Sequence, residues 1–198
     1  MRSGVLALTL LLLSPAETWA EWQIRPFLGV TFAGGTTLVD LAHAAGSPNI
    51  VVGVNGALLG DVIGIDVDFG HAPGFFESGD SHLVQRSSVT TLTGNVVIAP
   101  PRHLTEYTLG PYFVVGAGLM RARSDDFFGL LSVASTMPAM DVGGGANGFL
   151  SDRIGLSWDA RYFWSVGGKE VRGLSLGPQQ VSEQLSFWRA SMAVVIRR

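Results

Sequence analysis

The sequence contains no cysteine, one lysine (Lys169) and few charged residues, which make up 15% of the chain. Without cysteine it has neither a disulfide framework nor a thiolate for catalysis or metal binding. Ordinary soluble domains have about 25% charged residues, and their water-facing exterior usually needs them. The formal net charge is only -3, so the chain also lacks the basic surface that nucleic-acid binding requires.

Long apolar runs are also scarce, although 47% of the residues are hydrophobic. After residue 20, no segment reaches the roughly 20 consecutive apolar residues that a membrane-spanning helix needs. Glycine is abundant instead, with 26 residues that follow no collagen-like period. The apolar residues must therefore be distributed along the chain, in segments that also contain glycine.

The first twenty residues have the charged, apolar and cleavable order of a secretory signal. Arg2 precedes an apolar stretch over 5–13, and cleavage is expected after Ala20. The stretch is too short to anchor the chain as a membrane helix. We therefore predict a signal peptide over 1–20 and one exported domain over 21–198.

Apolar residues alternate with other residues at period two, the signal of a strand with two different faces. The segment from Ile154 to Trp164 keeps this alternation without a slip, and its length matches the 9 to 11 residues of a tilted bilayer-crossing strand. Pro111 cannot donate to a ladder, so its strand is expected to bulge or to begin later. The predicted strands lie near residues 23–32, 50–58, 63–70, 91–98, 108–119, 140–147, 154–164 and 187–196.

The connections between these segments alternate between long and short. Long polar or glycine-rich gaps fall at about 33–48, 71–86, 121–136 and 165–184. Outer-membrane barrels have an even number of strands, long outer loops, short periplasmic turns and both termini in the periplasm. We therefore predict an all-β fold, an eight-stranded antiparallel up-and-down transmembrane β-barrel in the bacterial outer membrane with its termini in the periplasm.

Period two alone does not distinguish this barrel from a soluble lipocalin-like barrel in the periplasm, which also has one apolar face. However, the less apolar face is rich in glycine, such as Gly53, Gly64 and Gly116, rather than in lysine and glutamate. Small residues suit a crowded interior, which places the apolar face in lipid. Its aromatic residues then predict a girdle at the lipid headgroups, formed by Trp158, Tyr162, Trp164, Trp188 and Phe69.

Charges of both signs fall on the face assigned to the interior. An unpaired buried charge would cost several kcal/mol, and eight strands enclose just enough space for side chains. We therefore predict a filled, charge-paired lumen, with a narrow conduit for small solutes or hydrophobic molecules as the alternative. The predicted network consists of Arg25, Asp66, Asp68, Glu106, Asp141, Asp159, Arg161 and Arg189.

These features, together with the stretch Gly110-Pro111-Tyr112-Phe113-Val114-Val115-Gly116-Ala117-Gly118, resemble the small outer-membrane β-barrel superfamily that includes the OmpA-like and OmpW-like barrels. The resemblance implies a monomeric protein of the Gram-negative cell envelope that contacts outer-membrane lipids and the barrel assembly machinery. Such barrels usually end in an aromatic residue that this machinery reads, whereas this chain ends in Arg197-Arg198. Recognition would then depend on Trp188 and the alternating pattern.

The histidines do not predict a metal site. His43, His71 and His82 fall in the first two predicted outer loops, and His103 falls in a short turn. A metal would require them to converge with carboxylates, and the spacing of Asp40, Glu77 and Asp80 does not indicate this. We therefore expect no metal and no cofactor.

The lipid A deacylases and palmitoyltransferases, which are outer-membrane barrel enzymes, resemble this chain in size. They use a histidine with a serine and an acidic partner. The second half of the chain has no histidine, and Ser78, Asp80, Ser81 and His82 lie together in a polar loop. A solvated loop is the simpler interpretation, so no catalytic residues and no enzyme are predicted, with a lipid-modifying barrel enzyme as an alternative.

The third predicted outer loop carries an apolar cluster, formed by Phe127, Phe128, Leu130 and Leu131. Such a cluster packs over the barrel mouth or contacts an unidentified ligand, lipid or partner surface. Together these patterns favour a non-enzymatic integral outer-membrane barrel with an envelope-structural or surface-interaction role.

Overall fold

The structure is a computed structural model that describes residues 21–36, 48–76, 84–100, 109–126, 133–166 and 184–198. The predicted signal peptide lies outside these residues. So do Glu106 and the apolar cluster from Phe127 to Leu131.

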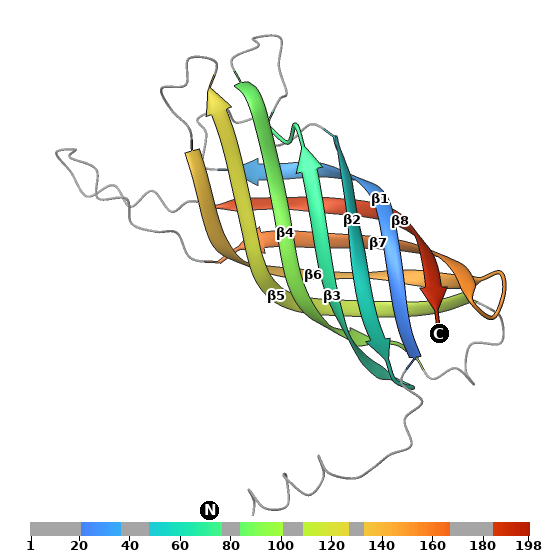
Figure 1. The fold of residues 1–198 in the computed structure, drawn as a ribbon. Coiled ribbons are helices and arrows are strands. Elements are labelled where there is room, and N and C mark those ends of the chain that lie inside the picture. Colours follow the sequence, from blue (N-terminus) through green and yellow to red (C-terminus); the bar gives the residue numbers. More distant parts are fainter. Residues whose placement is uncertain (1–20, 37–47, 77–83, 101–108, 127–132, 167–183) are drawn as a thin grey trace, which may run out of the picture.

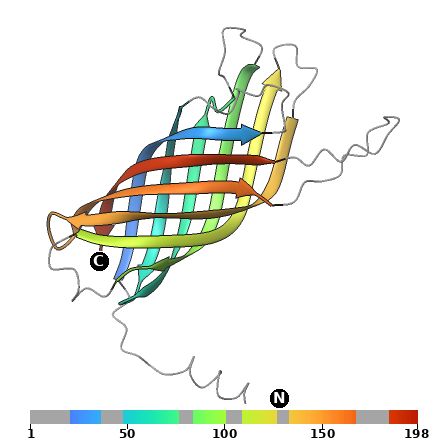
Figure 2. The ribbon, with the colours of Figure 1, turned by 180° about the vertical axis from the view of Figure 1, so that it is seen from behind.

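Eight antiparallel strands form one closed barrel, in which each strand pairs with its neighbours in sequence and β1 pairs with β8 (Figures 1 and 2). This confirms the predicted eight-stranded up-and-down barrel. The strands are β1 (Glu21–Thr36), β2 (Asn49–Leu59), β3 (Ile63–Pro73), β4 (Val84–Ile98), β5 (Leu109–Asp126), β6 (Val133–Phe149), β7 (Ile154–Ser165) and β8 (Leu185–Arg197).

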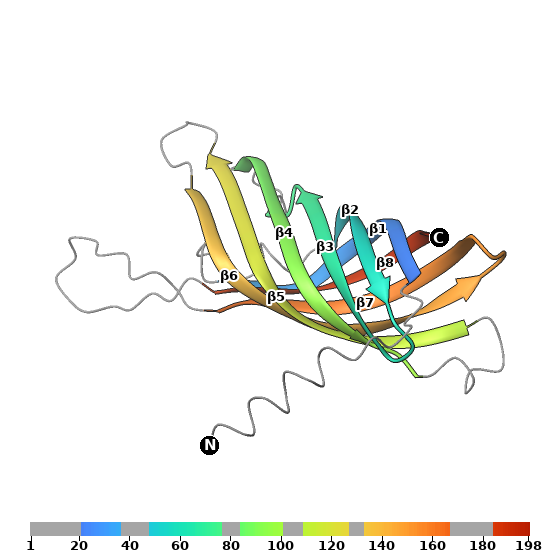
Figure 3. The same ribbon diagram turned by 60° about the horizontal axis from the view of Figure 1, so that its bottom comes forward.

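The strands continue beyond their predicted ends on the side of the long loops. The predicted gap over 121–136 was too long, because β5 runs to Asp126 and β6 begins at Val133. Alternation persists there with polar outward residues: Arg121 and Arg123 are exposed, whereas Ala122 between them is buried. An apolar outward face was the signal for a strand, so these polar extensions were missed. In Figures 1 and 3, β4, β5 and β6 rise side by side at this end.

Pro111 lies inside β5, without the later start that its chemistry suggested. Its Cα pairs with Ala146 of β6, and β5 is already paired with β6 from Leu109. The ladder with β4 begins only at Phe113. Pro111 therefore lies where one side of β5 has no strand partner, so its missing N–H removes no bond from the β4 ladder.

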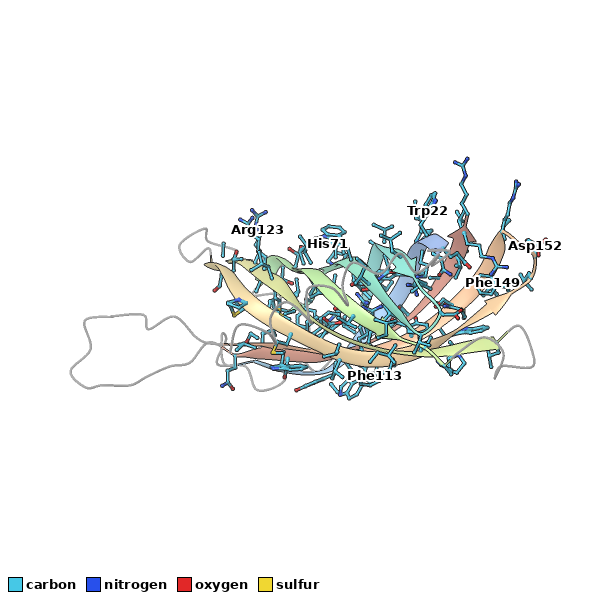
Figure 4. The ribbon with its side chains drawn as sticks, turned by 90° about the horizontal axis from the view of Figure 1, so that it is seen from below. Trp22, His71, Phe113, Arg123, Phe149 and Asp152 are labelled. Atoms are coloured by element: carbon cyan, nitrogen blue, oxygen red, sulfur yellow. The ribbon has the colours of Figure 1, made fainter. Side chains whose placement is uncertain are left out.

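The barrel wall is apolar outside and mixed inside, as the alternation predicts. In β3, Ile65, Val67 and Phe69 are exposed, whereas Asp66 and Asp68 between them are buried. Figure 4 shows Trp22 and Phe113 pointing away from the wall. The exposed large hydrophobic residues come from all eight strands. They form an apolar belt around the barrel.

The two ends of the barrel differ in their connections. At one end, which we call the turn end, residues 60–62 join β2 to β3 and residues 150–153 join β6 to β7. Both turns are closed by backbone hydrogen bonds, such as the one from the Gly60 N–H to the Ile63 carbonyl oxygen (3.1 Å). β1 starts and β8 ends at this end, and the two strand ends are joined by a hydrogen bond from the Arg198 N–H to the Trp22 carbonyl oxygen (3.2 Å). The opposite end is the loop end.

None of the described residues forms a helix that is long and apolar enough to cross a membrane.

Candidate functional site in the barrel interior

Arg161 of β7 occupies the centre of an ionic layer inside the barrel. Its Nη2 lies 3.2 Å from Asp66 Oδ2, and its Nη1 lies 3.6 Å from Asp141 Oδ2. Asp66 belongs to β3, four strands away around a barrel of eight, so this ion pair crosses the lumen. Arg161 Nε also donates to Asp159 on its own strand.

Glycine on the neighbouring strand makes room for this arginine. The Cα of Gly143 in β6 pairs with that of Arg161. A Cβ added at Gly143 would collide with the Ala160 carbonyl oxygen and with Arg161 itself. The glycine-rich inward face therefore provides the space that large charged side chains fill.

Arg189 of β8 forms a second pair across the lumen. Its Nη1 and Nη2 donate to the two carboxylate oxygens of Asp68, at 2.7 and 2.9 Å. This two-pronged geometry is the strong form of an arginine–carboxylate contact. The guanidinium also lies over the rings of Phe27 and Phe163, at 4.5 and 4.9 Å from their centroids.

Neutral polar side chains complete the layer. Ser191 donates to Asp159 Oδ1 (2.9 Å), and the Tyr112 hydroxyl donates to Asp159 Oδ2 (3.4 Å). Asn95 donates to Asp66. These partners reduce the cost of burying carboxylates.

The structure brings seven of the eight predicted lumen charges into one layer, and the eighth, Glu106, lies outside the described residues. Three arginines face four aspartates there: Arg25, Arg161 and Arg189 with Asp66, Asp68, Asp141 and Asp159. The interior charges therefore nearly balance, and six of the seven side chains are at most 2% exposed.

A second layer, which we call the aromatic layer, lies on the loop side of the ionic layer. Its rings include Phe163 and Phe187, stacked at 5.3 Å, and Phe75, 5.1 Å from Phe187. Aliphatic residues and methionines surround them. The buried members are Phe27, Val51, Ala72, Phe75, Phe76, Val89, Met120, Ala122, Met137, Ala139, Phe163, Leu185 and Phe187.

Sequence reasoning did not identify this layer. Phe27, Phe163 and Phe187 lie on the inward positions of their strands, and this parity was the available signal. Phe75 and Phe76 gave no such signal, because they lie just after β3 in a segment expected to be an outer loop. Within the described residues, this segment instead turns into the barrel mouth, where both side chains are at most 4% exposed.

Two polar contacts hold that segment in place. The Asn49 side chain donates to the Phe75 carbonyl oxygen (3.1 Å), and the Phe76 N–H donates to the Ser87 hydroxyl oxygen (2.9 Å). His71, also expected in this loop, lies in β3 instead. It is half-buried, and its Nδ1 lies 2.9 Å from the Thr90 hydroxyl.

The predicted girdle residues all lie on the outer face. Tyr162 lies between Trp164 and Trp188, with ring centroids 5.7 and 5.2 Å apart. This cluster lies near the loop end of β7 and β8. Trp158, by contrast, lies nearer the turn end of β7, and Phe69 of β3 is 43% exposed.

The described residues contain no group of three histidine or carboxylate side chains that could hold a metal ion. His71 lies within the described part of the chain. The other loop residues that could bear on metal binding or catalysis lie outside it: Asp40, His43, Glu77, Ser78, Asp80, Ser81, His82 and His103.

No family model matches the sequence, and a comparison with curated proteins gave no match. Several solved structures are similar. The outer membrane protein OprG from Pseudomonas aeruginosa has a TM-score of 0.62 at 12% identity, over 91% of this chain and 97% of OprG. Neisserial surface protein A has a TM-score of 0.58 at 12% identity, over 88% of this chain and 96% of that chain.

The N-terminal β-barrel domain of OprF from Pseudomonas aeruginosa is also similar, with a TM-score of 0.53 at 12% identity, over 91% of this chain and 99% of that domain. At such low identity these matches identify the fold. The chain has the fold of the small eight-stranded outer-membrane β-barrels, the group that its sequence resembles.

Proposed function

We propose that this protein is a non-enzymatic integral outer-membrane barrel that contributes to envelope structure or surface interactions and does not conduct solutes. The observation that carries the proposal is the combination of an apolar exterior with a doubly filled lumen. The exterior supports lipid as the surroundings of the barrel, and the interior supports a closed barrel rather than a pore.

The apolar belt argues for lipid. Residues such as Leu28, Ile63 and Ile65 are 57–66% exposed on the outer face, where a soluble barrel would carry charge. The aromatic cluster at the loop end suits a headgroup region. By analogy with known barrels, the turn end and both ends of the domain then lie in the periplasm.

The two lumen layers argue against conduction. An ion entering from the loop end would have to pass the aromatic layer, whose apolar side chains cannot compensate the ion for its lost hydration. Beyond it lie carboxylates and guanidiniums that already pair with one another. A closed barrel also leaves no free strand edge among the described strands for pairing with a second copy, which supports a monomer whose partners are lipids and the assembly machinery.

Membrane fractionation combined with gel migration before and after heating tests the placement. We expect the protein in the outer-membrane fraction, with a migration that changes on heating because the folded barrel resists detergent. Recovery in the soluble periplasm with no such change would instead indicate a lipocalin-like barrel.

Single-channel recording in planar bilayers tests the closed lumen. We expect no stable conductance from the purified protein. A large, stable conductance would overturn the closed lumen and favour the conduit.

Mass spectrometry of lipid A from expressing and non-expressing cells tests the non-enzymatic role, because an acyl chain lost or gained would indicate a lipid-modifying enzyme. His82→Ala would then test the one loop histidine considered for that role.

A further inference from the structure

A cavity of about 270 Å³ occupies the turn end of the lumen, below the ionic layer. Arg25 and Gln23 of β1, Tyr112 of β5 and Asn147 of β6 line it, with Arg197 of β8 at the same end. The turn from Gly60 to Gly64 also lines it, so the cavity reaches the turn end of the barrel. The closed lumen of the proposed function does not use this space.

Arg25 is the least paired arginine of the ionic layer. It is 2% exposed, and its one ion pair within the described part of the chain is a long one, 3.9 Å from Nη2 to Asp66 Oδ2. Asp66 already accepts from Arg161 at 3.2 Å and from Asn95. Arg25 Nε and Nη2 have no hydrogen-bond partner among the described residues. By contrast, Arg189 has both oxygens of Asp68.

The remaining wall suits a small organic anion. Among the described residues that line it, Arg25 and Arg197 are cationic, and Asp61, exposed on the β2–β3 turn, is the carboxylate. Arg197 is already paired with Glu21, at 3.6 Å, which leaves Arg25 as the cation for a ligand. Asn147 Oδ1 on the wall is buried and has no hydrogen-bond partner in the described structure. An amide can present either its oxygen or its NH2 group to a ligand.

Apolar groups line the rest of the cavity. They include Val97, Phe149 and the ring of Tyr112, above which the Arg25 guanidinium lies at 5.5 Å. Inorganic anions gain nothing from such walls, whereas an organic carboxylate with an apolar body can use both parts of the site. A guanidinium with two free nitrogens matches the two oxygens of a carboxylate.

We propose that this cavity binds a small organic carboxylate. The Arg25 side chain, which lines the cavity, would turn its buried Nε and Nη2 toward the carboxylate oxygens, while the apolar part of the ligand contacts Val97 and Phe149. The inference goes beyond the proposed function and does not depend on it, because the cavity lies inside the barrel wherever the barrel resides. Ligand would enter from the turn end, since the aromatic layer fills the other half of the lumen.

Nuclear magnetic resonance on the arginine side chains tests the site directly. The protein, refolded in detergent micelles and labelled with 15N-arginine, is titrated with sodium benzoate and separately with benzamide, which has the same ring but no charge. We expect a saturable shift of the Arg25 Nε–H resonance in the millimolar range with benzoate and none with benzamide. Arg25→Gln should weaken benzoate binding about tenfold or more, followed on the Arg197 resonance.

Two glycine variants keep the test decisive if Arg25→Gln does not refold. A Cβ added at Gly110 on the cavity wall or at Gly94 on the outer face meets no atom within 4 Å, so both sites can accept a side chain. Gly110→Leu should fill the cavity and abolish the shift, while Gly94→Leu should leave it unchanged. Absence of a saturable shift, an equal response to benzamide, or benzoate binding that survives Gly110→Leu would each overturn the proposal.

Discussion

The two halves of the lumen are filled in opposite ways. Toward the loop end, rings and aliphatic side chains pack together, and Phe163 and Leu185 are fully buried. Toward the turn end, polar and apolar groups together line a cavity of about 270 Å³. The ionic layer separates the two. The aromatic layer therefore closes the lumen, whereas the ionic layer pairs the buried charges. Substitutions can test the two layers one at a time.

Removing the central charge of the ionic layer should have the largest effect. Arg161→Met leaves four aspartates with two arginines, and we expect it to lower the free energy of unfolding by about 3–5 kcal/mol, because the carboxylates lose their shared partner. Urea unfolding in lipid vesicles, followed by tryptophan fluorescence, measures this. Arg123→Met, at an exposed position near the loop end, is the control and should change the free energy little (Figure 4). Equal effects would show that Arg161 is not a central partner.

The aromatic layer should respond differently to truncation. Phe187→Ala removes a ring that stacks on Phe163 and contacts Phe75, so we expect a loss of about 3 kcal/mol from the free energy of unfolding. It should also introduce brief conductance events in planar bilayers, because the layer that excludes water is opened. Phe113→Ala, on the outer face, should give none. Conductance that is unchanged in Phe187→Ala would locate the barrier to solutes elsewhere.

The strands of the barrel wall could be predicted from the sequence alone, because alternate positions of each strand face two different surroundings. Lipid or water outside and a crowded lumen inside force alternation, so Asp66, Asp68 and Arg161 could be assigned to the interior from parity. The same alternation gave the strand number. It failed where the outward residues become polar, as at Arg121 and Arg123, because an apolar outward face was the signal for a strand and there the apolar residue, Ala122, faces inward.

The contents of the lumen were harder to predict, because they depend on which residues meet across the barrel. Parity places Arg25 and Arg189 inside equally well. Arg189 is bound by both oxygens of Asp68, whereas Arg25 has among the described residues one ion pair, 3.9 Å long. The difference depends on the position of each side chain along the barrel axis, which is set by the register between neighbouring strands. The position of Phe75 depends on a turn held by Asn49, for which the sequence offers no periodic signal.

A methyl group in the ionic layer should cost less than a lost charge. Gly143→Ala places a Cβ against the Ala160 carbonyl oxygen and the Arg161 side chain, and we expect it to lower the free energy of unfolding by about 1–3 kcal/mol through overpacking. Gly94→Ala adds the same methyl on the outer face, where it meets nothing within 4 Å, and should be nearly neutral. Urea titrations of both variants under one condition compare them. Equal losses would mean that strand propensity, not crowding, explains the cost.

The smallest effect is expected from a substitution at Tyr112, which lies between the ionic layer and the cavity. Tyr112→Phe removes the hydroxyl that contacts Ser157 (3.2 Å) and Asp159 (3.4 Å), and the net loss should be about 1 kcal/mol from the free energy of unfolding. Tyr162→Phe, within the outer aromatic cluster, is the matched control and should lose less. If the two losses were equal, the Tyr112 hydroxyl would add nothing to the layer, as expected if water from the cavity replaced it. A larger loss for Tyr112→Phe would show that the Tyr112 hydroxyl, on the cavity wall, belongs to the ionic layer, because its hydrogen bond to the Asp159 carboxylate would then contribute to stability.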